Sequence, residues 1–138
     1  MKIESASIPG KCESCRGDGV YEVAQVLHDG FIEWEVEFKC SACQEQYAER
    51  GLGAGSDWLR DALKKENGEW GVVAESFSRP KAMKVFRSIY ENSLAEAKMM
   101  ADRLAGAGIN GTHIESEFLA MRLRAYDGAS EVKVVKVS

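Results

Sequence analysis

Two helical patterns, separated by a sharp break, lie between residues 80 and 104. In the first, apolar residues recur at three- and four-residue spacing, which gives a helix one apolar face. Ser93 followed by Glu96 is the signature of a capping box, so we expect a second helix to begin there. The apolar face of the first helix and the buried stripe expected for the second comprise Ala82, Val85, Phe86, Ile89, Tyr90, Leu94, Ala97, Met100, Ala101 and Leu104.

Strict alternation of apolar and charged residues marks residues 31–39 as a half-buried antiparallel strand. Residues 20–27 are rich in β-forming residues, and residues 28–30 (His-Asp-Gly) have the chemistry of a tight turn. We therefore expect a β-hairpin, preceded by a loosely held N-terminal segment over residues 1–10. One face of the second strand carries Ile32, Trp34, Val36 and Phe38, and the other, expected to be solvated, carries Glu33, Glu35 and Glu37.

Four cysteines flank this hairpin as two C-x-x-C pairs, Cys12 with Cys15 and Cys40 with Cys43. Each pair presents two sulfur atoms on one turn, and the 24 intervening residues bring the pairs together. Four thiolates in a tetrahedron suit Zn²⁺ and leave no open position for catalysis. The pattern is that of a zinc ribbon, so we predict a structural zinc site with these four ligands.

Other uses of the four cysteines stay open. A rubredoxin-like iron site takes the same ligands, and the sequence does not separate iron from zinc. A redox dithiol usually consists of one C-x-x-C near a βαβ unit, and disulfides are disfavoured in a reducing cytosol. So short a hairpin needs its metal to fold. The ribbon therefore either has a purely structural role or also presents a surface that a partner contacts.

Charge is unevenly distributed along the 138 residues, whose net charge is −4. Residues 1–69 carry 8 Lys and Arg against 14 Asp and Glu, whereas residues 70–138 carry 10 against 8. An acidic first half repels a phosphate backbone, which argues against nucleic acid as its partner. No run approaches the ~18 apolar residues of a membrane span, and residues 1–10 lack the apolar segment of a secretory signal. We therefore expect a cytoplasmic protein.

No catalytic constellation is recognisable in the sequence. It contains no phosphate loop of the form G-x-x-x-x-G-K-[ST], no G-x-G-x-x-G and no H-E-x-x-H motif. His28 lies in the expected turn and His113 at the start of the last expected helix, and we expect both to be surface or capping residues. We therefore expect no enzyme activity.

The predicted fold class is α+β. A zinc ribbon over residues 1–50 precedes residues 51–68, where a glycine-rich linker leads into a short helix capped by Ser56 or Asp57. The sequence does not indicate on which half of the chain this helix packs. Residues 69–138 follow the order βααβαβ, with the third helix ending at residues 127–128 and the last strand over residues 130–137. This order suits a three-stranded antiparallel sheet covered by helices on one face.

Two short runs carry a family resemblance. Residues 82–87 read Ala-Met-Lys-Val-Phe-Arg and residues 94–98 read Leu-Ala-Glu-Ala-Lys, at a fixed separation. Together with the strand expected at residues 70–73, they make residues 69–136 resemble the C-terminal domain of the bacterial ribosomal stalk protein (the L-seven/L-twelve family). The chain departs from that family at residues 91–93, where Glu-Asn-Ser replaces a Gly-Leu-Gly turn, and it has a ribbon in place of the family's dimerising helices and hinge.

The resemblance implies a recruiting module whose first two helices offer a basic and apolar surface to translation factors. The family's functional lysines and arginine correspond to Lys84, Arg87 and Lys98. Charged residues at these positions would equally be expected if they served only to keep the surface soluble. We therefore expect a zinc-binding, non-enzymatic adaptor that docks a protein partner, with a translation factor as the partner that the resemblance implies. Two alternatives stay open: an inhibitor or immunity-type protein that blocks a toxin or enzyme with its acidic half, and a ribosome- or nucleic-acid-associated zinc ribbon protein.

Overall fold

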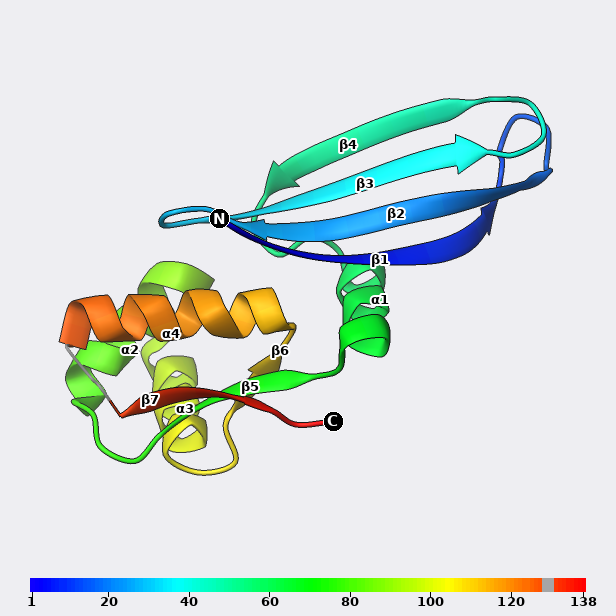
Figure 1. The fold of residues 1–138 in the computed structure, drawn as a ribbon. Coiled ribbons are helices and arrows are strands. Elements are labelled where there is room, and N and C mark those ends of the chain that lie inside the picture. The colour runs from blue at the N-terminus through cyan, green and yellow to red at the C-terminus, as the bar shows by residue number, and fades with distance from the viewer. Residues whose placement is uncertain (128–130) are drawn as a thin grey trace. The chain divides into compact units, whose positions relative to one another are not determined.

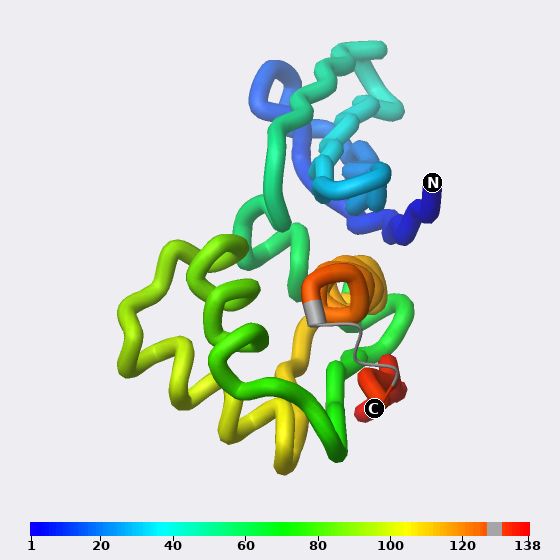
Figure 2. The backbone as a smooth tube through the Cα atoms, turned by 90° about the vertical axis from the view of Figure 1, so that its left-hand side faces the viewer, coloured from blue at the N-terminus to red at the C-terminus, as the bar shows by residue number. Residues whose placement is uncertain are grey.

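The chain divides into two compact units, Met1–Gly68 and Glu69–Ser138. The computed structural model describes residues 1–127 and 131–138 (Figure 1), and Figure 2 follows the backbone from a second direction. Within these two described stretches, no helix is both long enough and apolar enough to cross a membrane. Strands dominate the first unit, whereas strands and helices alternate in the second.

The first unit is an antiparallel sheet with one helix. Its strands are hydrogen-bonded in the order in which they occur along the chain (Figure 1). The hairpin expected between residues 20 and 39 is therefore confirmed. The elements are β1 (Lys2–Lys11), β2 (Asp18–Leu27), β3 (Ile32–Cys40), β4 (Gln46–Leu52) and α1 (Asp57–Asn67).

Helix α1 covers one face of this sheet. Ala6, Val23 and Val36 alternate with outward-facing residues on three neighbouring strands, and they pack against Leu59 and Leu63 of the helix. Both leucine side chains are fully buried. The helix therefore packs on the first unit, which answers the question that its sequence left open, and it begins directly after the expected cap residue Ser56.

Two glycines let aromatic rings lie close to the backbone near one end of the sheet. A Cβ atom at Gly10 would overlap the ring of Tyr21, and a Cβ atom at Gly19 would overlap the ring of Phe38. Glycine in a strand often marks such a close approach. Gly10 pairs with Gly19, and Gly19 pairs with Cys40, so both rings lean toward the end of the sheet that carries the cysteines.

The two outer strands differ from the sequence-based expectation. The prediction that residues 1–10 form a loosely held N-terminal segment is wrong. Strand β1 pairs with β2 along its whole length, from Lys2 opposite Leu27 to Lys11 opposite Asp18. Strand β4 was not expected, and it includes the first two residues of the predicted glycine-rich linker. Nearly every residue of β4 is exposed, so its sequence shows no apolar alternation.

The second unit contains a three-stranded antiparallel sheet in the order β6-β5-β7 (Figure 1). The predicted α+β fold class and the order βααβαβ are thus confirmed. Its elements are β5 (Trp70–Ala74), α2 (Arg79–Tyr90), α3 (Leu94–Ala105), β6 (Ile109–Gly111), α4 (His113–Asp127) and β7 (Val132–Lys136).

One face of this second sheet forms a core with the three helices. Val72 and Ala74 of β5 and Val132 of β7 lie on the same face and are buried. They pack with residues from all three helices, of which Phe86 is the largest fully buried side chain. The helical members of this cluster are Ala82, Val85, Phe86, Ala97, Ala101, Leu104, Leu119, Ala120 and Leu123.

The predicted break between α2 and α3 is confirmed. Ser93 Oγ accepts a hydrogen bond from the Glu96 backbone N–H at 3.1 Å, and Glu96 Oε1 accepts one from the Ser93 backbone N–H at 2.9 Å. Leu94 was predicted to be buried, which is wrong: it is 62% exposed, because the first residue of the helix lies before the stripe that faces the core. Gly128 and Ser130, expected at a helix end and a strand start, lie outside the described residues.

We predict that Ser93→Ala lowers the free energy of unfolding by about 1 kcal/mol, since the backbone N–H of Glu96 loses its acceptor. Glu96→Gln is the matched control, because a glutamine at this position can still accept from the Ser93 backbone N–H. Chemical denaturation of both variants measures the difference. Equal losses for the two variants would contradict this account of the cap.

Candidate metal centre

The four cysteines lie in two loops at the same end of the first sheet. Cys12 and Cys15 lie in the connection between β1 and β2. Cys40 ends β3, and Cys43 lies in the loop before β4. Because Gly19 at the start of β2 pairs with Cys40, the sheet register holds the two loops beside each other.

The two loops have the same local conformation. The backbone N–H of Cys12 donates to the Gly17 carbonyl at 2.9 Å, and that of Cys40 donates to the Glu45 carbonyl at 2.8 Å. In both loops the residue after the second cysteine is left-handed, with φ of 61° at position 16 and 65° at position 44. Each C-x-x-C pair is therefore held by a closed turn of its own before any metal is considered.

The sulfur atoms of the four cysteines all lie within 4.8 Å of one another. Cys12 Sγ is 3.7 Å from Cys43 Sγ, and Cys15 Sγ is 3.5 Å from Cys40 Sγ. Four sulfurs bound at about 2.3 Å to one tetrahedral ion stand about 3.8 Å apart. A disulfide would instead need about 2.05 Å. The spacing thus fits a shared metal ion and does not fit two disulfides.

The pKa values of Cys40 and Cys43 are shifted in opposite directions. The pKa of Cys40 is lowered to about 7, chiefly because the Cys43 backbone N–H donates to its sulfur, although burial opposes this. The Glu45 backbone N–H lowers the pKa of Cys43, but the Cys15 thiol, burial and the sulfurs of Cys40 and Cys12 together raise it to about 12. The Cys40 thiolate therefore forms readily, whereas ionisation of Cys43 is opposed by its surroundings. A bound cation removes that opposition.

The donor set decides what this site can do chemically. Cys12 and Cys40 are buried and Cys15 and Cys43 are exposed, so the cluster lies at the surface with half of its ligands covered. Four clustered cysteines could hold a metal ion such as zinc. Four protein ligands complete a tetrahedron, which is the arrangement of a structural site.

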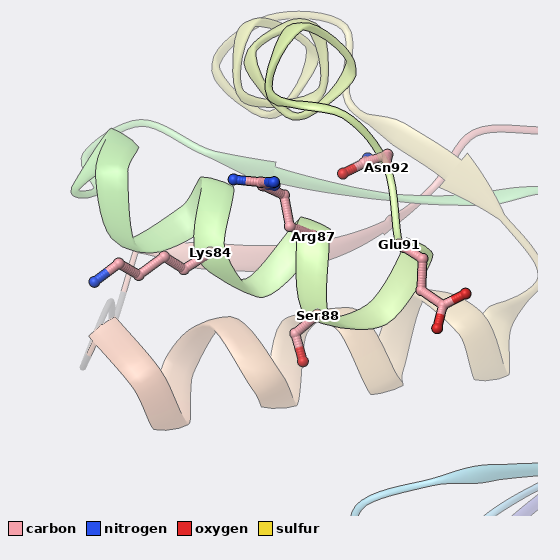
Figure 3. A pocket seen from close by; sticks show the side chains of 5 residues that line it. All are labelled: Lys84, Arg87, Ser88, Glu91 and Asn92. Carbon is pink, nitrogen blue, oxygen red and sulfur yellow. The ribbon is translucent and has the colours of Figure 1, made fainter.

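The other predicted site residues lie in the second unit. Lys84 and Arg87 of α2 line one surface hollow, which we call the α2 hollow (Figure 3). The Arg87 side chain extends from α2 toward α3, and the Lys84 side chain extends away from it (Figure 3). Lys98 is exposed on α3 and is not one of the lining residues. The structure thus places two of the three predicted cations at one hollow.

Three further residues of the α2 hollow were missed by the sequence analysis: Ser88, Glu91 and Asn92. Ser88 and Glu91 follow Lys84 and Arg87 by four positions, a spacing that places both pairs on one side of a helix. That spacing was a signal that could have found them. Ser88 Oγ accepts a hydrogen bond from Arg122 of α4 at 3.1 Å.

Among the residues that the structure describes, the cluster of possible metal ligands includes neither histidine. The His28 ring stacks on Phe31 with a centroid distance of 4.5 Å. The His113 ring stacks on Trp70 at 3.9 Å, and its Nε2 lies 3.1 Å from a carboxylate oxygen of Glu117. Both histidines are half-buried rather than fully exposed, and their contacts are structural ones.

We predict one tightly bound metal ion per chain. Cys40→Ser removes a ligand, so metal affinity falls by more than the about 100-fold that loss of an outer-shell partner costs. Ser41→Ala, one residue away in the same loop, keeps all four sulfurs and wild-type affinity. Elemental analysis and competition with a chelator measure both. Wild-type affinity in Cys40→Ser would contradict a four-cysteine site.

The expected architecture is borne out in its coarse form, as a four-cysteine cluster on N-terminal β-hairpins followed by an α+β unit. No protein-family model, no curated protein and no solved structure matches this chain. The resemblance of residues 69–136 to the ribosomal stalk domain stays a prediction.

Proposed function

We propose that the chain is a zinc-binding, non-enzymatic protein-interaction module. The first unit would hold Zn²⁺ through Cys12, Cys15, Cys40 and Cys43, and the second would dock a protein partner. Zinc is favoured because it takes four thiolates in a tetrahedron without a redox role. The sulfur separations of 3.5 and 3.7 Å support a tetrahedral metal ion with four sulfur ligands.

The observation that carries the docking proposal is the pair of cations at the α2 hollow. Lys84 and Arg87 are both exposed. Within residues 1–127 and 131–138, neither forms an ion pair with a carboxylate, and nor does Lys98. Unpaired cations gathered on two helices are available to an acidic surface of a partner.

Exposed apolar side chains are also present on the same two helices. Tyr90 is 44% exposed, Leu94 62% and Met99 58%. An exposed ion pair contributes only about 0.2–1 kcal/mol, so the cations would set encounter rate and orientation rather than affinity. The exposed apolar side chains would then contribute most of the binding free energy.

One polar atom at the α2 hollow also favours a ligand there. Asn92 Oδ1 is buried and accepts no hydrogen bond from the described residues, while its Nδ2 contacts Met100 Sδ at 3.2 Å. Buried polar atoms in folded proteins almost always have a partner. A donor from a docked protein would satisfy this one.

We propose a translation factor as the partner, as the resemblance of residues 82–87 and 94–98 to the ribosomal stalk domain suggests. A factor captured through the second unit would be brought to whatever the first unit contacts. This is the role of an adaptor.

The acidic face of the first unit favours a second candidate function, that of an inhibitor which covers a basic surface of a toxin or enzyme. Glu22 and Glu37 pair directly across β2 and β3, and Glu35 lies on the same face, opposite Arg50 of β4. Like charges directly opposite each other destabilise a sheet. A basic partner would relieve this repulsion.

We predict that Lys84→Glu/Arg87→Glu weakens capture of translation factors from a native extract by at least about tenfold, because two favourable charge contacts become repulsive. Lys133→Glu/Lys136→Glu on β7 is the matched control with the same change in net charge. A pull-down with quantitative mass spectrometry measures both.

Three other outcomes would contradict the adaptor proposal. Equal loss of factors in both double variants would indicate a general effect of charge. Capture of one unrelated protein that survives Lys84→Glu/Arg87→Glu and is lost in Glu35→Lys/Glu37→Lys would instead support the inhibitor. Binding of RNA that falls steeply with salt would support a nucleic-acid-associated ribbon.

A further inference from the structure

A row of aromatic side chains crosses the first sheet next to the cysteine loops. Tyr21 pairs with Phe38, and Phe38 pairs with Tyr47, so the three side chains lie on one face of β2, β3 and β4. The ring centroids of Tyr21 and Phe38 are 4.7 Å apart, and those of Phe38 and Tyr47 are 5.7 Å apart. Phe38 is buried, whereas Tyr47 is 45% exposed and presents its ring at the edge of the sheet.

These rings form one wall of a small cavity beside the metal centre. Its lining also includes the loop residues Cys12, Glu13 and Glu45. The cavity has a volume of about 70 Å³. This is a little over two water molecules at about 30 Å³ each and far below the about 300–1,000 Å³ of small-molecule sites. It therefore fits the head group of one side chain and not a cofactor.

The charges around the cavity favour a cation. Its lining includes the carboxylates of Glu13 and Glu45, and its lysine, Lys11, already pairs with Asp18. The pKa of Tyr47 is raised to about 12 by a hydrogen bond with Tyr21, by burial, and by nearby charges that include Glu13. A divalent ion held by four thiolates would leave net negative charge behind the wall formed by Cys12.

We propose that this aromatic-acidic cavity, bounded by Tyr21, Tyr47, Glu13 and Glu45, is a docking site for an arginine side chain of a partner protein. Aromatic faces attract cations, and the planar guanidinium both stacks on a ring and donates hydrogen bonds to carboxylates. A phosphate or an acidic peptide would be repelled. The site lies in the first unit, takes a basic partner and does not depend on the docking role of the second unit.

The test uses the full chain loaded with zinc and a peptide probe, acetyl-Gly-Gly-Arg-Gly-Gly-amide. The control peptide carries citrulline, which has the shape of arginine without its charge. Binding is followed by two-dimensional NMR of backbone amides. The arginine peptide is expected to shift the amides of residues 11–15 and 44–48, and the citrulline peptide is not.

Protein variants separate the cavity from the general negative charge of the first unit. Tyr47→Leu keeps an apolar side chain and removes the ring, so we expect the dissociation constant to rise about two- to fivefold. Glu45→Gln tests the carboxylate with almost no change in shape, and Tyr126→Leu is the control for loss of an exposed tyrosine elsewhere. Metal content is measured for each variant.

The proposal is overturned if the arginine peptide shifts amides across the whole acidic face, or if citrulline binds equally well. It is also overturned if Tyr47→Leu and Glu45→Gln, both with full metal content, bind as wild type does. If Tyr47→Leu loses its metal, the result for Glu45→Gln alone decides. Failure here would leave the docking role of Lys84 and Arg87 untouched, since that role concerns another unit and an acidic partner.

Discussion

Four sulfur atoms lie within 4.8 Å of one another at one end of the first sheet, and they form the site on which we expect the fold of that unit to depend. The sheet register and two matching closed turns hold the cysteines together, but the neighbouring thiols and burial raise the pKa of Cys43 when no cation lies among the sulfurs. A shared metal ion would remove this opposition, since metal binding in small domains of this kind contributes on the order of 10 kcal/mol to folding. Such an ion would also tie the β1–β2 loop to the β3–β4 loop and so link all four strands at this end of the sheet.

The rest of the first unit is held together by apolar and aromatic contacts. Helix α1 supplies a conventional apolar contact through Leu59 and Leu63 in the middle of the sheet. Toward the metal end the core consists of aromatic rings that lean over Gly10 and Gly19. These rings cover the buried cysteines and leave Tyr47 exposed at the edge. The same arrangement thus supports the metal site and creates a surface of aromatic and acidic character.

The two units present surfaces of opposite charge for physical reasons that differ. The glutamates on β3 alternate with apolar residues; Glu37 is exposed as expected, whereas Glu33 and Glu35, also expected to be solvated, are half-buried. In the second unit, Lys84 and Arg87 lie on α2 opposite its buried residues Ala82, Val85 and Phe86. Protein fold alone does not specify which partner contacts either surface.

The sequence was most informative where a strong local rule applied. The spacing of the cysteines, the alternation in β3 and the capping box at Ser93 each predicted the observed structure, because each depends on a few neighbouring residues. Strands β1 and β4 were not predicted, since edge strands with one or no buried face carry little alternation, and β1 contains Pro9. Leu94 was wrongly predicted to be buried, because helical spacing does not show how far along the helix the neighbouring elements cover it. The cavity beside Tyr47 depends on cross-strand register, which local patterns do not specify.

The measurement that tests the central claim most directly is amide hydrogen exchange of the full chain before and after metal removal by a chelator. The account predicts that protection is lost throughout β1–β4, while the amides of β5, α2, α3 and α4 keep theirs. Unchanged protection in β1–β4 after complete metal removal would contradict a first unit that depends on its four-cysteine site.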